Sequence, residues 1–168
     1  MGLPAAVAVV LVMEVSARRA AVEDLEVLVA LYRALEREMT NLHPMWPLAD
    51  GLSEPVEAAL IEALVDSFVY VGEIDGYPAG FAIARIEDLL PQGGGETVGS
   101  FRFIFTELEA REVGVGEALL TRAMDELRAA GVCRFDAHVL PGHRLAKNFF
   151  EAGGFSARHI VMYHHDVD

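Results

Sequence analysis

A glycine-containing turn between a β-type segment and a helical segment constrains this chain more than any other feature of its sequence. The turn reads Arg111-Glu112-Val113-Gly114-Val115-Gly116. It follows a run of β-branched and aromatic residues at 98–106 and precedes apolar residues at helical spacing from Leu119 to Leu127. A turn that enters a helix leaves backbone N–H groups without partners, and glycine lets an anion approach them closely. The turn therefore predicts an anion-binding site, to which Arg111 can add a charge-assisted hydrogen bond.

Two common phosphate-binding turns do not fit this sequence. The nucleotide triphosphatase loop needs GxxxxGK followed by Ser or Thr, and that pattern is missing here. The dinucleotide-binding turn needs a third glycine, and Leu119 stands at its position. Because two glycines before a helix often mark only a turn, the rest of the chain has to supply the context.

The rest of the chain alternates between strand and helix patterns. We expect strands at 13–18, 68–73, 77–86, 98–106, 135–140 and 155–164. Helices are expected at 22–39, at 56–65, after the glycine turn as far as Gly131, and at 144–152. Asp75-Gly76 predicts a hairpin, and alternation predicts that Phe101, Phe103 and Phe105 share one face of their strand. This order predicts a mixed α/β or α+β fold with a parallel crossover through the helix after the turn.

The length and the ends of the chain indicate one domain. Residues 1–168 suit a single core, and we see no linker. Residues 1–12 are almost wholly apolar, and we interpret them as an N-terminal extension or a strand. No Lys or Arg precedes Arg18, so the charged start of a signal peptide is missing, and the apolar run is too short for a membrane span. We expect a cytoplasmic protein and treat export as the less favoured interpretation.

Charge and cysteine content narrow the expected partners. Thirteen Lys and Arg residues stand against 26 Asp and Glu residues, which gives a formal net charge of −13. Such a charge repels nucleic acid and anionic membranes, and we expect neither as a partner. It would attract a cationic amine, although acidity that serves only solubility is the favoured interpretation. The single cysteine, Cys133, allows no intrachain disulfide, and we expect no metal site.

Together these features resemble the GNAT superfamily of acyl-CoA-dependent N-acyltransferases. The family motif is Arg or Gln, two residues, Gly, one residue, then Gly or Ala, and the turn at 111–116 matches it in full. A second block, Ala146-Lys147-Asn148-Phe149-Phe150-Glu151-Ala152-Gly153-Gly154-Phe155, is similar to the family's alanine and paired aromatic residues that close on Gly-Phe. The resemblance extends from about residue 15 to residue 162.

The resemblance implies a fold and a set of cofactor contacts. The implied fold is a mixed, mostly antiparallel sheet of six to seven strands, flanked by about four helices and splayed between its fourth and fifth strands. The implied cosubstrate is acetyl-CoA, and its implied contacts are Phe105, Thr106, Arg111, Glu112, Val113, Gly114, Val115, Gly116, Lys147 and Phe150. An amine acceptor would arrive near the loop at 41–55, so His43 and Trp46 are the candidate substrate residues, with a position that caps the core as the alternative for Trp46.

The catalytic groups are less clear from the sequence. Direct attack of an amine on a thioester needs a proton acceptor for the amine and a proton donor for the departing thiolate. The family often places a tyrosine acid where this chain has Phe150, which has no proton to give. His143 is the candidate substitute acid, with an uninvolved histidine as the more ordinary interpretation. Glu107 is the candidate base, with a solvated surface position as its alternative.

The expected function is transfer of an acetyl group from acetyl-CoA to a primary amine of a small molecule or peptide. The alternative is a non-catalytic acyl-CoA-binding sensor or subunit, which the phenylalanine at position 150 favours. A third interpretation is an interaction protein on the same fold, since members of the family tend to dimerise and a homodimer is an expected assembly.

Overall fold

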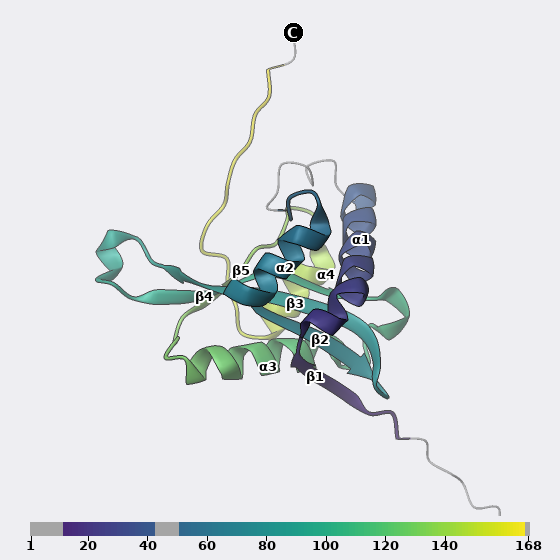
Figure 1. The fold of residues 1–168 in the computed structure, drawn as a ribbon. Helices are drawn as coiled ribbons and strands as arrows, with labels where there is room; N and C mark the ends of the chain where they lie inside the picture. Colours follow the sequence, from purple (N-terminus) through teal and green to yellow (C-terminus); the bar gives the residue numbers. More distant parts are fainter. Residues whose placement is uncertain (1–11, 43–50, 167–168) are drawn as a thin grey trace, which may run out of the picture.

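Helices cover both faces of one sheet in the computed structural model, which describes residues 12–42 and 51–166 (Figure 1). Among these residues the strands are β1 (Val15–Arg19), β2 (Phe68–Ile74), β3 (Tyr77–Asp88), β4 (Thr97–Thr106) and β5 (Phe135–Ala137). The helices in the same residues are α1 (Leu25–Leu42), α2 (Val56–Asp66), α3 (Val115–Ala129) and α4 (Arg144–Ala152), and three short 3₁₀ turns are also described there. The expected mixed α/β architecture with about four helices is confirmed.

The strands follow their sequence order across the sheet, from β1 to β5. The first four are antiparallel, and β4 and β5 are parallel, as the crossover through α3 requires. Asp75 and Gly76 both have positive φ, at 49° and 80°, which suits a tight hairpin turn between β2 and β3. The predicted hairpin is confirmed.

The sheet is smaller than we expected. The described residues contain five strands rather than six to seven, and the strand predicted at 155–164 does not form. Ile160, Val161 and Met162 in that segment are each more than 70% exposed, and only Phe155 at its start packs against the core under α3. Apolar content alone therefore misled the prediction, because a strand also needs a neighbour for its backbone groups. The fifth strand ends at Ala137 rather than at residue 140.

Two apolar cores lie on the two sides of the sheet. The first packs α1 and α2 against one face, where Leu28 and Tyr32 meet Phe81 and Phe103. The second packs α3 and α4 against the other face, with Leu119 and Phe150 among its buried residues. The helices thereby fix the sheet from both sides.

A β-bulge in β4 divides its aromatic residues between the two cores. Phe103 lies opposite Ile83 of β3, whereas Phe101 lies opposite the next residue, Ala84, so Arg102 is the extra residue. Phe103 belongs to the core under α1 and α2, and Phe101 belongs to the core under α3. The prediction that all three phenylalanines of β4 share one face is therefore wrong for Phe101, because one extra residue reverses the alternation.

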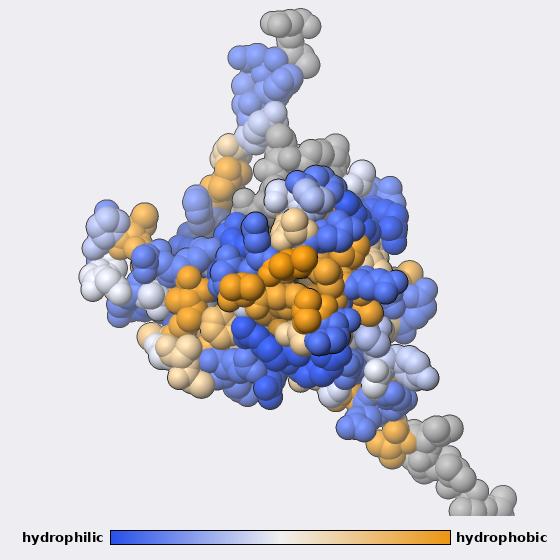
Figure 2. Space-filling model, in the orientation of Figure 1, coloured by the Kyte–Doolittle hydropathy of each residue, from blue (hydrophilic) through white to orange (hydrophobic). Residues whose placement is uncertain are grey.

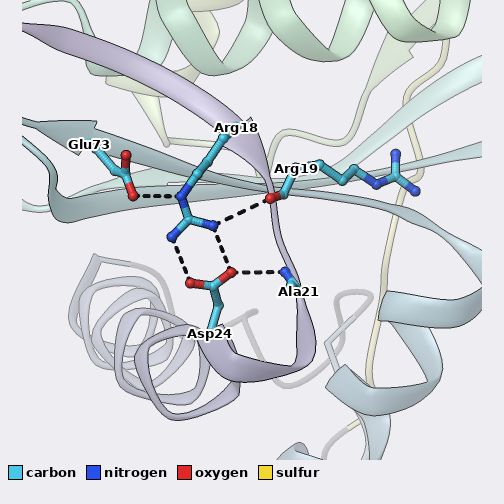
Figure 3. A network of polar contacts seen from close by, with 5 residues as sticks. All are labelled: Arg18, Arg19, Ala21, Asp24 and Glu73. Atoms are coloured by element: carbon cyan, nitrogen blue, oxygen red, sulfur yellow. Dashed lines mark hydrogen bonds and ion pairs between the residues drawn. The ribbon is translucent and has the colours of Figure 1, made fainter.

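A network of ion pairs fixes the chain between β1 and α1 (Figure 3). Arg18 lies between Glu73 of β2 and Asp24, with N–O distances of 2.7 Å to each carboxylate. Asp24 Oδ2 also accepts a hydrogen bond of 2.8 Å from the Ala21 backbone N–H. The hydrogen bonds from Arg18 lower the pKa of Asp24, against the opposing effect of burial. The network sets where α1 begins.

Apolar side chains form a band around α2 on the surface shown in Figure 2. On α2 itself, Ile61 is 46% exposed and Val65 is 86% exposed. Between residues 12–42 and 51–166, we find no helix that combines the length and the apolarity needed to cross a membrane.

Candidate functional site

The sheet opens between β4 and β5. Their pairing ends at Phe101 and Ala137, and the last bond is donated by the His138 N–H to the Phe101 carbonyl, at 3.0 Å. Beyond this point lies a hollow, which we call the strand hollow. Its walls come from α1 (Leu35, Met39), β4 (Phe101, Arg102, Phe103, Ile104), the segment after β5 (His138, Leu140, His143) and α4 (Ala146, Phe150). The predicted opening between the fourth and fifth strands is confirmed.

The glycine turn, residues 111–116, joins β4 to α3 and carries free hydrogen-bond donors. Among the described residues, no backbone or side-chain acceptor binds the N–H groups of residues 112–117, and the first bonded amide is Ala118, which donates to the Gly114 carbonyl. Unpaired N–H groups at the positive end of a helix form a site for an anion. The turn therefore offers unpaired N–H donors at the place where the sequence predicts an anion site.

The backbone of the turn explains its glycines. Gly114 has φ of 102°, in the left-handed region that side chains disfavour, and it is the residue that directly precedes α3. Glu112 also has a positive φ, of 65°, although it carries a side chain. A Cβ atom on Gly116 would lie 3.1 Å from the Phe149 ring, so the glycine lets α4 pack closely against the start of α3. The turn is thus shaped both by its own backbone and by α4.

Arg111 is held by the protein itself. Its guanidinium forms an ion pair with Glu38 of α1, and its Nε donates a hydrogen bond of 3.0 Å to the Thr106 carbonyl. The guanidinium also lies 5.8 Å from the centre of the Phe105 ring. Arg111 therefore ties α1 to the end of β4. Glu38 could not be recognised from the sequence as part of this site, because its partner Arg111 lies 73 residues away.

His143 lies at the junction of these elements. It precedes α4, it lines the strand hollow, and its Nε2 is 3.9 Å from Glu38 Oε1. Burial lowers its pKa, Glu38 opposes that effect and Arg111 adds to it. A histidine with a lowered pKa is neutral at pH 7 and can accept a proton. The geometry thus favours a proton acceptor over the proton donor that we considered from the sequence.

The other candidate cofactor residues occupy different environments. Phe150 is buried, lines the strand hollow and packs edge-on against Phe149 and Phe155. Lys147 is exposed and pairs with Glu151 at 2.6 Å. The Phe105 side chain is buried in the core under α1, so only its backbone is available to a ligand in the strand hollow. Val115 is buried, and Val113 packs against the core under α3.

The candidate catalytic and substrate residues outside the hollow are placed as follows. Glu107 is exposed and lines neither of the hollows described in this section. His43 and Trp46 lie outside the described residues. Within the described ranges, no group of three or more His, Cys, Asp or Glu side chains is arranged to hold a metal ion.

A second hollow lies beside the strand hollow, on the face of the sheet under α1 and α2. It is lined by Gly51, Leu52, Ile83, Arg85, Arg102 and Phe103. Arg102 and Phe103 line both hollows, so the two spaces share a wall at the β-bulge. The sequence did not indicate this space, because the bulge that turns Arg102 toward it leaves no recognisable pattern.

The residues present fit a CoA-type ligand. The unpaired N–H groups of residues 112–117 suit a pyrophosphate, and on the side facing β5 no strand pairs with β4 beyond Phe101 in the described part of the chain. An extended pantetheine chain could therefore bind along this edge by β-type hydrogen bonds.

Comparisons with known proteins agree with this geometry. The model of the acetyltransferase (GNAT) family matches residues 28–155. Similar solved structures include the aminoglycoside N-acetyltransferase AAC(6')-Iy in complex with CoA, at 19% identity and a TM-score of 0.69, covering 96% of this chain and 99% of that one. A GCN5-related N-acetyltransferase from Ralstonia eutropha is 20% identical, with a TM-score of 0.70 over 90% of this chain and 99% of that one.

A third similar structure is an aminoglycoside acetyltransferase from an uncultured soil metagenomic sample, in complex with sisomicin. It is 14% identical, with a TM-score of 0.68, and covers 92% of this chain and 97% of that one. No curated protein matches the sequence. These structures share the fold, and the family match spans most of the chain, including both the glycine turn and the Phe149-Phe150 block. The chain therefore belongs to the acetyltransferase (GNAT) family.

Proposed function

We propose that this protein transfers an acetyl group from acetyl-CoA to a primary amine of a small molecule or peptide. The observation that carries the proposal is the set of unpaired N–H groups at residues 112–117, which lies at the end of β4 next to the opening between β4 and β5. Acetyl-CoA supplies the acyl group as a thioester: the amine nitrogen bonds to the carbonyl carbon, and the carbon–sulfur bond breaks.

We expect cofactor contacts at two places, the glycine turn and the strand hollow. The N–H groups of the glycine turn would bind the pyrophosphate, and Gly114 and Gly116 keep side chains away from it. Phe150 would pack against the thioester end of the ligand, because it lines the strand hollow. Much of the rate enhancement would come from holding amine and thioester together in this space.

His143 would accept the proton of the attacking amine. Its imidazole is neutral at pH 7, since burial lowers its pKa. The carboxylate of Glu38, 3.9 Å from Nε2, would stabilise the imidazolium that forms. Glu107 is a weaker candidate for the same role, because its exposed side chain does not line the strand hollow.

The alternative function is that of a non-catalytic acyl-CoA-binding sensor or subunit. The observation that favours it is Phe150, which occupies the place of the tyrosine acid and offers no proton to the departing thiolate. Both functions predict acetyl-CoA binding, so binding alone does not separate them.

Two measurements separate these functions. The first is calorimetric titration of acetyl-CoA into the purified protein, and the second is release of free CoA in the presence of a panel of primary amines. Amine-dependent release of CoA supports the enzyme, and its loss in His143→Gln with unchanged acetyl-CoA affinity supports the role of His143. Tight binding without release for any amine would favour the sensor, and no binding to the folded protein would contradict both.

The assembly and the location of the protein are part of the proposal. We propose a homodimer in the cytoplasm, with no nucleic acid or membrane partner and no metal. The exposed Ile61 and Val65 of α2 are the apolar surface that a second copy could cover. Light scattering of the protein and of Val65→Glu tests this: a dimer mass that falls in the variant supports it, and a monomer in both contradicts it.

A further inference from the structure

The second hollow contains an arginine, Arg85, whose terminal guanidinium nitrogens have no partner among residues 12–42 and 51–166. Arg85 of β3 is half-buried, and its Nε donates a hydrogen bond of 3.0 Å to Ser67 Oγ. Among the described residues, no acceptor binds either of its terminal nitrogens and no carboxylate forms an ion pair with it. The nearest acidic contact runs through Ser67, whose hydroxyl donates to Asp66 at 2.6 Å.

The chain has 26 acidic residues and 13 basic ones. Arg37 and Arg144 also lack a carboxylate partner among the described residues, but both are exposed, whereas Arg85 is half-buried. Arginines elsewhere in the described residues, such as Arg18 and Arg111, pair directly with carboxylates. A half-buried guanidinium loses hydration without regaining a charge partner, and this costs stability. Its planar ends match a carboxylate, which can accept two parallel hydrogen bonds from them.

The residues beside Arg85 also favour an anionic ligand. Ser100 lies directly opposite Arg85 in the β3–β4 ladder, and its buried Oγ has no hydrogen-bond partner among the described residues. Buried hydroxyls are normally bonded, so this corner of the sheet has spare donors on two adjacent strands. Arg102, at the bulge, is held by Glu87 of β3 with an N–O distance of 3.0 Å and lines the same hollow. Two arginines, Arg85 and Arg102, therefore contribute to the wall of the second hollow.

The second hollow lies next to the proposed place of the reaction. Arg102 and Phe103 separate the second hollow from the strand hollow, where the thioester is proposed to lie. A molecule with its anionic end at Arg85 could thus place another group at the strand hollow. The net charge of −13 attracts the cationic amine of such a molecule, and Arg85 would bind its opposite end.

We propose that the acceptor is an amine that also carries a carboxylate, of the amino-acid or peptide kind, and that Arg85 binds this carboxylate. The inference rests on the proposed acetyl transfer and specifies its substrate class. It differs from the polycationic acceptor that the bound sisomicin of one similar structure would suggest.

The test compares acids with their own amides. Amino acids and dipeptides are assayed for CoA release from acetyl-CoA, each beside the matching C-terminal amide, together with sisomicin as a carboxylate-free amine. We expect kcat/KM at least about tenfold higher for the free acids than for the amides, as one charge-assisted contact gives. Arg85→Ala should remove this preference mainly through KM, and Arg85→Lys should restore part of it.

Controls separate a local effect from a folding defect. Arg122→Ala removes a positive charge from α3, where Arg122 pairs with Glu126 at 2.7 Å on the other side of the sheet, and should keep the preference. Acetyl-CoA affinity measured by calorimetry should be the same in Arg85→Ala as in the wild type. Because the comparison of acids with amides needs only the wild-type protein, it holds even if a variant folds poorly.

The outcomes distinguish this inference from the proposed function. If CoA is released but amides and sisomicin react as well as acids, or if Arg85→Ala lowers all of them alike, the carboxylate inference is wrong and acetyl transfer stands. If no amine of either kind releases CoA, both the proposed acetyl transfer and the carboxylate inference are wrong.

Discussion

Replacing Gly114 with alanine tests the glycine turn with the smallest possible change. Gly114 has φ of 102°, and a Cβ atom there would meet no other atom within 4 Å. The methyl group therefore causes no collision, and the cost is backbone strain of about 1–2 kcal/mol. For a chain of this size we expect the melting temperature to fall by about 2–8 °C.

The same change should weaken acetyl-CoA binding more than it weakens the fold. The backbone can relieve the strain by turning the peptide at Gly114, which changes the directions of the unpaired N–H groups of Gly114 and Val115. A hydrogen bond to a charged group is worth about 1.5–3 kcal/mol, so losing one such contact raises the Kd by roughly 10- to 150-fold. Calorimetric titration of acetyl-CoA measures this.

Gly94 provides a matched control. It also has a positive φ, of 65°, and open space around its Cβ position, but it lies in the turn between β3 and β4. Gly94→Ala should lower the melting temperature by a similar amount and leave the Kd unchanged. The reasoning is refuted if Gly114→Ala binds acetyl-CoA like the wild type, or if both variants lose affinity equally.

Three further predictions follow from other residues. Asp24→Asn should lower the free energy of unfolding by about 1–3 kcal/mol in urea titrations at pH 7. Because the fold lowers the pKa of Asp24, this contribution is present above about pH 3.9 and is lost as the pH falls through the folded pKa. Equal stability of variant and wild type at pH 7 would contradict the prediction. His143→Gln should lower kcat by about 10²- to 10⁴-fold. Because burial lowers the pKa of His143, the wild-type activity should fall only as the pH drops below about 6.5. Identical pH profiles of variant and wild type would argue against His143 as the proton acceptor. Gly116→Ala places a methyl group 3.1 Å from the Phe149 ring and should lower the free energy of unfolding by about 1–3 kcal/mol. Adding Phe149→Leu should partly restore the stability. If the effects of the two substitutions on the free energy of unfolding simply add, the two residues do not clash.

The sequence predicted the order of elements well where local patterns determine it. The helix at 144–152 matches α4 residue for residue, because an apolar stripe lies between His143 and the glycines that follow Ala152. The hairpin at Asp75-Gly76 and the glycine turn were likewise visible, since each depends on neighbouring residues. The opening of the sheet came from the family resemblance and not from any periodicity.

The parts that the sequence did not predict depend on distant contacts. Glu38 faces Arg111 across 73 residues, and helical spacing says only that Glu38 is polar. The bulge at Arg102 inserts one residue into a regular alternation of phenylalanines, so the pattern predicted the wrong face for Phe101. The segment at 155–164 has the composition of a strand, but its residues after Phe155 are exposed, and none of the described strands pairs with it.

The bulge explains why both hollows lie at one place on the sheet. Without the extra residue, Phe101 and Phe103 would share a face, and Phe101 could not pack with Phe150 and Phe155 under α4. With it, Phe101 supports the floor of the strand hollow from one face, while Phe103 closes the core under α1 from the other. Arg102 is left at the boundary, where it lines both spaces. An acceptor bound at Arg85 and a thioester bound beside Phe150 would therefore approach each other from opposite faces of β4, across the one point where its alternation breaks.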